Sequence, residues 1–249
     1  MTDSILELPR DTSGRRIAYG DDPNQFGELY LPGTSGPHPV VIFIHGGFWR
    51  AKYDLTHASH LCAAIAKSGC AVWSLEYRRV GQPGGGYPGT LDDVRAGARH
   101  VAQISGLDHR RVVVAGHSAG GHLALWLAAQ EAIELRGVVG LAAVCDLRRA
   151  RELNLGKGAV DAFLGGIDHD SLASPIELLP MRVPQRLLHG TADDVVPIEL
   201  SERFARASKN SQLIALPAVG HFELIDPRSP EWPTVLDHIR EPLLYSAHV

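Results

Sequence analysis

The sequence has few cysteines and no motif that would pair them. Cys62, Cys70 and Cys145 are an odd number of widely spaced thiols, and they form no CxxC pair. A disulfide framework needs an even, patterned set of cysteines, and a cysteine-based zinc site needs closely spaced pairs. We therefore expect three free, buried thiols in a reducing compartment.

Long apolar runs and a strong charge of one sign are also missing. No apolar segment approaches the roughly 20 residues that cross a bilayer, and residues 1–16, MTDSILELPRDTSGRR, lack the apolar region of a signal peptide. The net charge is −4 and both signs are interspersed, so neither nucleic acid nor a membrane surface is favoured as a partner. We expect a cytoplasmic protein with a small-molecule substrate, and the composition leaves a homodimer open.

What the chain does have is a regular alternation of buried-type strands and helices. Apolar runs that stop at glycines suit strands buried on both faces, as in a parallel sheet. Residues 27–33 alternate and predict an antiparallel edge strand. The other predicted strands are 39–47, 70–78, 111–118, 137–147, 184–190 and 211–220, and the predicted helices are 54–69, 87–105, 119–130, 197–208 and 231–244. This pattern predicts an α/β fold with a mostly parallel, twisted sheet covered by helices on both faces.

One segment interrupts the alternation. Residues 146–183 are longer than an ordinary connection between a strand and a helix. They predict a short, lid-like helical excursion after the sixth strand. The rest of the 249 residues is accounted for by one sheet, so we expect 1–249 to form a single domain.

A serine lies between glycines where a predicted strand meets a predicted helix, in VVVAGHSAGG at 112–121. A serine hydroxyl is a poor nucleophile unless it is exposed, has a base nearby and has donors for the oxyanion that forms. A strained turn at Ser118 would supply the exposure, and Gly116 and Gly120 would leave room for the neighbouring strand and helix. The pattern predicts Ser118 as a nucleophile.

A second glycine-rich turn, HGGFWR at 45–50, follows another apolar strand. Backbone N–H groups of such a turn can approach a substrate oxygen closely because glycine has no Cβ. We predict an oxyanion hole from the segment Gly46, Gly47 and Phe48 together with the N–H of Ala119. His45 is interpreted as a residue that orients this loop through hydrogen bonds.

The base and its carboxylate partner are expected further along the chain, in the order acid and then histidine. His221 follows the last predicted strand and precedes the final helix, which favours it as the base. Asp193 comes first after a strand-end turn in HGTADDVVP and is the preferred acid. Asp194 and Asp146 remain alternatives for the acid.

These motifs, HGGFW, GHSAGGH, HGTADDVVP and GHF, stand in the order and spacing that resemble the α/β-hydrolase superfamily over about residues 20–245. More narrowly, HGGFWR with GHSAGGHLA is similar to the small carboxylesterase and arylformamidase (kynurenine formamidase)-like branch. The resemblance implies catalytic roles for Ser118, Asp193 and His221, and it implies no metal and no organic cofactor. Phe48 departs from the third glycine common in esterase loops of this type.

The residues around these motifs suggest a pocket for a flat or aromatic group. The aromatic candidates for the substrate-binding wall are Phe48, Trp49, Tyr87 and Phe222, with Tyr53 beside them. Arg50 and Arg78 are candidate partners for a substrate carboxylate.

Three functions are carried forward. The preferred one is a serine hydrolase that cleaves a small carboxylic ester through an acyl-enzyme. An arylformamidase acting on N-formylkynurenine is the alternative. A non-catalytic, ligand-binding protein of the same fold is the third, but such binders typically lose one of the three catalytic residues, and here all three are present.

Overall fold

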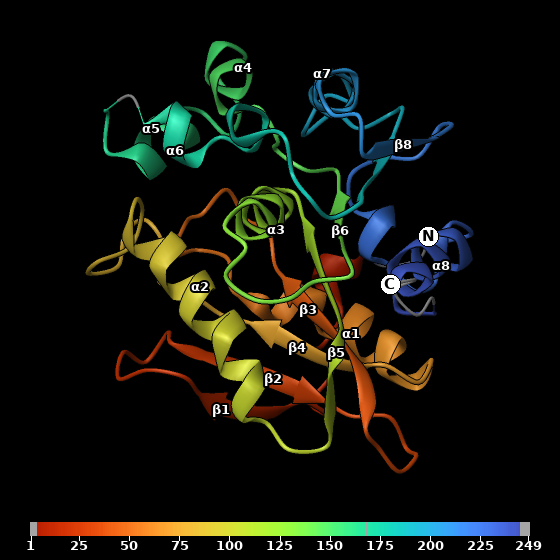
Figure 1. Ribbon diagram of the computed structural model, residues 1–249. Coiled ribbons are helices and arrows are strands. Elements are labelled where there is room, and N and C mark those ends of the chain that lie inside the picture. Colours follow the sequence, from red (N-terminus) through yellow and green to blue (C-terminus); the bar gives the residue numbers. More distant parts are fainter. Residues whose placement is uncertain (1–3, 168, 245–249) are drawn as a thin grey trace.

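The computed structural model describes residues 4–167 and 169–244, and a twisted sheet runs through their centre (Figure 1). Within those residues the sheet has eight strands in the order β1-β2-β4-β3-β5-β6-β7-β8. Strand β2 pairs antiparallel with both β1 and β4, and all strand pairs from β4 to β8 are parallel. The strands are β1 (Arg15–Ala18), β2 (Phe26–Tyr30), β3 (His38–Ile44), β4 (Ala71–Leu75), β5 (Leu107–His117), β6 (Gly137–Leu141), β7 (Gln185–Gly190) and β8 (Ser211–Leu216). The arrangement confirms the predicted α/β fold.

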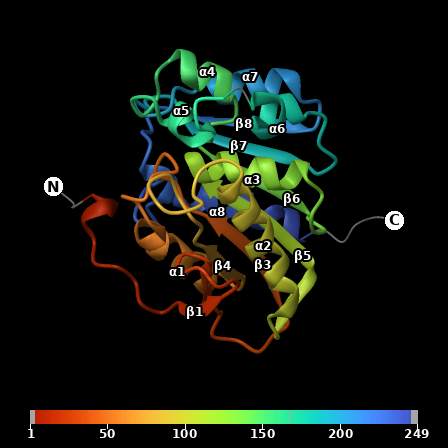
Figure 2. The same ribbon diagram turned by 90° about the vertical axis from the view of Figure 1, so that its left-hand side faces the viewer.

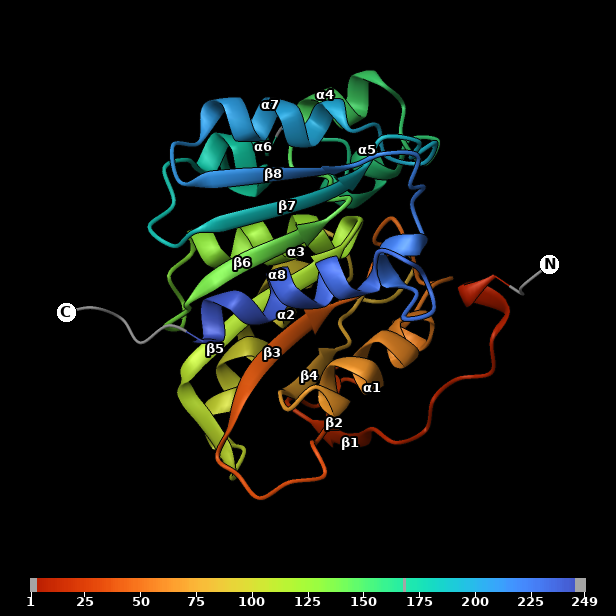
Figure 3. The same ribbon diagram turned by 90° about the vertical axis from the view of Figure 1, so that its right-hand side faces the viewer.

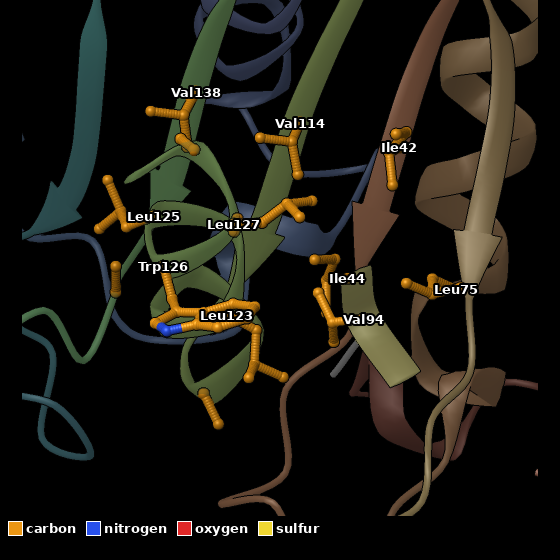
Figure 4. Packing of buried hydrophobic residues seen from close by; sticks show 14 of the residues in the cluster. Ile42, Ile44, Leu75, Val94, Val114, Leu123, Leu125, Trp126, Leu127 and Val138 are labelled. Carbon is orange, nitrogen blue, oxygen red and sulfur yellow. The ribbon is translucent and has the colours of Figure 1, made fainter. Parts of the chain in front are cut away.

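The central strands are apolar on both faces because helices cover both. Each residue from Val40 to Ile44 of β3 is fully buried, and Ile42 is in register with Val114 of β5 and Trp73 of β4. Figure 4 shows Ile42, Val114 and Val138 in a row, facing the side chains of the helix that follows β5. This explains why these strands are continuous apolar runs without alternation.

The helices form two layers. On one face lie α1 (Ser59–Lys67) and α8 (Trp232–Leu244), and on the other lie α2 (Gly89–His100), α3 (Ala119–Ala129) and α7 (Glu199–Ala207). Figure 3 shows α1 and α8 in front of the sheet with α2 and α3 behind it. Each layer packs on its own hydrophobic cluster, so the sheet is the wall between two cores.

The excursion after β6 is helical, as predicted. It contains α4 (Leu147–Glu152), α5 (Ala159–Leu164) and α6 (Asp170–Ala173) and lies above α3 in Figure 2. Two side chains of α3 hydrogen-bond to the excursion. Trp126 Nε1 donates to the Leu172 carbonyl at 3.0 Å, and His122 Nε2 donates to the Ala173 carbonyl at 2.9 Å. The excursion therefore packs on α3, on the face of the sheet that α3 covers.

Two predicted strands need correction. The segment 27–33 is not the edge strand, because β1 pairs outside β2 and takes that position. The strand predicted over 137–147 ends at Leu141, because Ala142 adopts a positive φ of 47° that breaks the extended backbone. Both changes leave the parallel centre of the sheet as predicted.

The three cysteines are free thiols inside the fold, as predicted. Cys62, Cys70 and Cys145 are all free and buried. No helix in the described part of the chain is both long enough and apolar enough to span a bilayer.

Candidate active site

The turn that carries Ser118 joins β5 directly to α3 and is strained. Ser118 has φ 57° and ψ −120°, and its side chain is almost buried. A Cβ on Gly116 would lie 2.2 Å from the Gly120 carbonyl oxygen, and one on Gly120 would lie 2.0 Å from the Ile44 carbonyl oxygen. Only glycine fits at both positions, which is the physical reason for the GxSxG spacing.

The structure pairs His221 with Asp193, and not with the alternative aspartates. His221 Nδ1 lies 2.7 Å from Asp193 Oδ2, and both side chains are buried. Asp194 is exposed, whereas Asp146 caps α4 by accepting from Arg149 N and also binds Arg203. The preference for Asp193, the first aspartate after the strand-end turn, agrees with this geometry.

The Asp193 carboxylate is held by its loop as well as by His221. Its Oδ1 accepts from the N–H groups of Val195 at 2.9 Å and Val196 at 2.8 Å. Burial alone would raise the pKa of Asp193, but the hydrogen bonds from His189, His221 and the Val196 N–H outweigh it and lower the pKa well below the usual value. Asp193 is therefore ionised throughout the neutral range and fixes the Nδ1–H tautomer of His221.

His189 is a buried support behind this pair. Its Nδ1 lies 2.7 Å from Ser201 Oγ, its Nε2 lies 2.8 Å from the Val196 carbonyl, and the same Nε2 lies 3.4 Å from Asp193 Oδ2. The carbonyl contact requires a proton on Nε2, so this N–H also faces the carboxylate. The histidine of the HGTADD motif thus fixes the loop that presents Asp193.

His117, the residue before Ser118, is packed against His221. Its Nε2 donates to the His221 carbonyl at 3.0 Å, and the two rings lie 4.4 Å apart. Burial, with the neighbouring His221 and His57, lowers the pKa of His117 well below its usual value. A neutral His117 can adjoin an imidazolium at His221 without charge repulsion.

The loop after β3 has the backbone conformation expected of a donor site. Gly47, Phe48 and Trp49 have positive φ values of 111°, 51° and 57°. A Cβ on Gly47 would lie 2.4 Å from Tyr53 Cβ, so this position requires glycine. Across the described residues, no intramolecular hydrogen bond uses the backbone N–H of Gly47, Phe48 or Ala119, which leaves these donors for a ligand.

The buried carboxylate of Glu76 supports the loop after β3 through several hydrogen bonds. Glu76 bonds His45 Nε2 at 3.0 Å and the Leu55 N–H at 3.1 Å, and it pairs with Arg79 Nη1 at 3.1 Å. Arg79 in turn donates to the Tyr53 carbonyl at 2.7 Å. His45 thus contacts the carboxylate that supports the loop, and its orienting role stays a prediction.

A cavity of about 120 Å³ opens between these groups. Both Ser118 and His221 line it, and Ser118 Oγ makes no hydrogen bond to a described residue. The other lining residues are Leu6, Gly47, Phe48, Tyr53, His57, His117, Val195 and Phe222. The motifs did not single out Leu6, His57 or Val195, because their segments meet the cavity only through the tertiary fold.

Two predicted pocket residues lie elsewhere. Trp49 is fully buried, stacks on Phe163 at 4.7 Å and donates from Nε1 to His122 Nδ1 at 3.2 Å. Tyr87 stacks on His169 at 4.2 Å. Trp49 thus connects the excursion to the loop after β3, and Tyr87 connects it to the segment before α2. Of the predicted aromatic wall, Phe48 and Phe222 line the cavity.

The two candidate arginines are engaged away from the cavity. Arg50 donates to the Gly156 carbonyl at 2.6 Å and the Lys157 carbonyl at 3.2 Å. Arg78 forms a bidentate pair with Asp93 at 2.8 and 2.6 Å. Within residues 4–167 and 169–244 no cluster of histidine, cysteine, aspartate or glutamate has the makings of a metal site.

Comparison with known proteins agrees with the fold. The chain is 31% identical to the esterase LipC of Mycobacterium tuberculosis over 85% of its length and spans 60% of that protein. It is 30% identical to a probable isoprenylcysteine alpha-carbonyl methylesterase of Oryza sativa, over 79% of this chain and 54% of the relative. The chain therefore spans little more than half of these relatives.

Solved structures show the same architecture. Esterase B of Lactobacillus rhamnosis superposes with a TM-score of 0.80 at 22% identity, over 95% of this chain and 87% of that one. The Est2 esterase of Thermogutta terrifontis gives a TM-score of 0.75 at 22% identity, over 92% and 91%. The model of the BD-FAE family matches residues 28–207. With the fold, the strained serine turn and this match in agreement, the chain belongs to the BD-FAE family of the α/β-hydrolase superfamily.

Proposed function

We propose that the protein is a serine carboxylesterase that cleaves a small, uncharged ester through an acyl-enzyme. The observation that carries this proposal is the meeting of three features at one cavity: Ser118 on its strained turn, His221 bonded to ionised Asp193 at 2.7 Å, and unused backbone donors. Esterases among the relatives support ester cleavage over other hydrolytic reactions.

In the proposed reaction Ser118 Oγ attacks the acyl carbonyl while His221 Nε2 accepts the hydroxyl proton. Hydroxyl–imidazole contacts are often long in empty sites and tighten when substrate binds. The backbone N–H groups of Gly47 or Phe48 and of Ala119 stabilise the oxyanion, a contribution of roughly 3–4 kcal/mol for each donor. Asp193 stabilises the imidazolium that forms.

Collapse of the intermediate breaks the ester C–O bond, and His221 returns the proton to the leaving alcohol. Water then attacks the acyl-enzyme while His221 accepts its proton, and Ser118 regains its hydrogen as the carboxylic acid leaves. No cofactor takes part in these steps.

The cavity supports a small and uncharged substrate group. Its volume of about 120 Å³ is below the roughly 150 Å³ of a protein cavity that holds benzene. Among the residues that the structure describes, no lysine, arginine, aspartate or glutamate lines it. A simple short ester therefore fits better than N-formylkynurenine, whose carboxylate would find Arg50 and Arg78 already engaged.

The decisive experiment replaces Ser118. We expect Ser118→Ala to abolish hydrolysis of p-nitrophenyl acetate, because Ser118 carries the one aliphatic hydroxyl among the described residues that line the cavity. A fluorophosphonate probe should label the wild-type protein, and peptide mapping should find the adduct on Ser118. Wild-type turnover by the alanine variant would refute the assignment, and a protein with neither turnover nor labelling would be a ligand binder instead.

The choice of substrate needs a parallel measurement. We expect kcat/KM for p-nitrophenyl acetate to exceed that for N-formylkynurenine, because the lining residues provide no cation for the second substrate. The reverse order would favour an arylformamidase.

A further inference from the structure

One wall of the cavity comes from the far N-terminal part of the chain. The 3₁₀ turn η1 (Ile5–Glu7) brings Leu6 to the cavity that Ser118 and His221 line. Figure 3 shows this turn at the end of the molecule to which the parallel strands point, which is where the catalytic loops lie. Leu6 nevertheless keeps 48% of its surface exposed.

The turn that carries Leu6 is firmly built. Ser4 and Glu7 form a capping box, in which Ser4 Oγ accepts from the Leu6 N–H at 3.4 Å and Glu7 Oε2 accepts from the Ser4 N–H at 3.3 Å. Ile5, the adjacent residue, is only 4% exposed and belongs to the hydrophobic core of the α1 and α8 layer. The backbone that carries Leu6 is therefore anchored, and the Leu6 side chain lines the cavity.

The chain after the turn is anchored as well. The Pro9 carbonyl accepts from His60 Nε2 at 2.7 Å, and the Asp11 N–H donates to Ser59 Oγ at 3.0 Å. Arg10 pairs with the buried Glu28 carboxylate of β2. These contacts hold residues 9–11 against α1 and β2.

Several of the other residues that line the cavity are aromatic. Phe48, Tyr53 and Phe222 line it together with Leu6, and Tyr53 is 40% exposed. An exposed leucine at the mouth of a cavity gains stability only when a further apolar group covers it. The chain end of a bound substrate is the group that would reach this position.

We propose that Leu6 is a specificity-determining residue, which limits the length of the substrate chain that the cavity accepts. This inference rests on the proposed esterase function. The geometry that carries it is a capped N-terminal turn, anchored to the core through buried Ile5, that places Leu6 in the lining of a cavity of about 120 Å³. Shortening this side chain extends the cavity, and enlarging it closes the mouth.

The test compares Leu6→Ala and Leu6→Trp with the wild-type protein on two series of esters. One series lengthens the acyl chain, in p-nitrophenyl esters from acetate to hexanoate, and the other lengthens the alcohol in acetate esters from methyl to hexyl. In one series Leu6→Ala should raise kcat/KM for the longest ester relative to the shortest by about tenfold, the scale of a methylene-sized change in an apolar pocket. Leu6→Trp should lower the same ratio.

Leu31→Ala is the matched control, since Leu31 is 52% exposed and does not line the cavity. Its chain-length profile should equal that of the wild-type protein. A profile that stays unchanged in both Leu6 variants, or an equal loss on all esters, would overturn the inference while leaving the esterase function intact. If the wild-type protein and the Leu31 variant cleave no ester in either series, both proposals fall.

Discussion

Among single residues, Asp193 offers the sharpest test of the catalytic arrangement, because an asparagine in its place keeps the shape and loses the charge. Asparagine Oδ1 can still accept from the Val195 and Val196 N–H groups. It would not stabilise an imidazolium at His221, and comparable changes in serine proteases cost about 10⁴ in kcat. We expect Asp193→Asn to lower kcat for p-nitrophenyl acetate by about 10³–10⁴-fold.

The neighbouring aspartate provides the control for this change. Asp194 is exposed and does not contact His221, so Asp194→Asn should retain the wild-type kcat. Equal losses of kcat in the two variants would show that kcat depends on the negative charge of the loop and not on the Asp193–His221 hydrogen bond.

At this scale the sequence predicted which chain segments meet at the cavity better than it predicted side-chain directions, and the catalytic roles stay predictions. Ser118, Asp193 and His221 follow strand ends, and parallel strands bring such positions to one edge of a sheet. Trp49 follows the same logic, yet its φ of 57° turns the indole into the core against Phe163. No local pattern encodes that rotation, because it depends on a helix more than a hundred residues away.

Among the elements, the β5–α3 junction restricts the choice of residue most strongly, because the backbones at Gly116 and Gly120 leave no room for a Cβ. The helix starts one residue after Ser118, so its first turn packs directly against the backbone of β3. We expect Gly120→Ala to lower the free energy of unfolding by about 3 kcal/mol, because the new methyl group would overlap the Ile44 carbonyl oxygen and overpacking of this kind is costly. Urea unfolding at neutral pH measures it.

Gly33→Ala is the matched change in a loop. No atom lies within 4 Å of a Cβ at Gly33, and its φ is not in the left-handed region. Its unfolding free energy should stay within about 0.5 kcal/mol of the wild-type value. A Gly120 variant as stable as the Gly33 variant would mean that β3 and α3 can separate without loss.

The elements themselves were predictable to the extent that they are buried. The β3, β5 and β6 runs and the α3 helix appear in the sequence because both faces of the sheet exclude polar residues. The β1 strand was missed because it has four residues, which are mostly exposed, and two of them are arginines. An edge strand of that kind is specified by its partner, β2, and hardly by its own composition.

At the scale of the whole molecule, the fold removes several histidines from water, so that they bind a proton more readily in the unfolded chain than in the folded one. Burial lowers the pKa of both His57 and His122 to about 4, and His117 is shifted in the same direction. Between the folded value and the unfolded value of about 6.5, the unfolded chain binds more protons than the folded one. The stability that these residues contribute is therefore complete above pH 6.5 and is lost as the pH falls toward 4.

This linkage can be measured at His122, which lies outside the cavity and is fully buried between Trp49 and the Ala173 carbonyl. A group with a pKa of about 4 when folded and 6.5 when unfolded lowers the unfolding free energy by about 2 kcal/mol at pH 5 relative to pH 8. In His122→Gln the stability difference between the two pH values should shrink by that amount, whatever the variant loses in absolute terms. Exposed His109→Gln is the control, and urea unfolding at both pH values is the measurement. An unchanged difference in the His122 variant would mean that the acid sensitivity of the fold originates elsewhere, with the carboxylates as the remaining source.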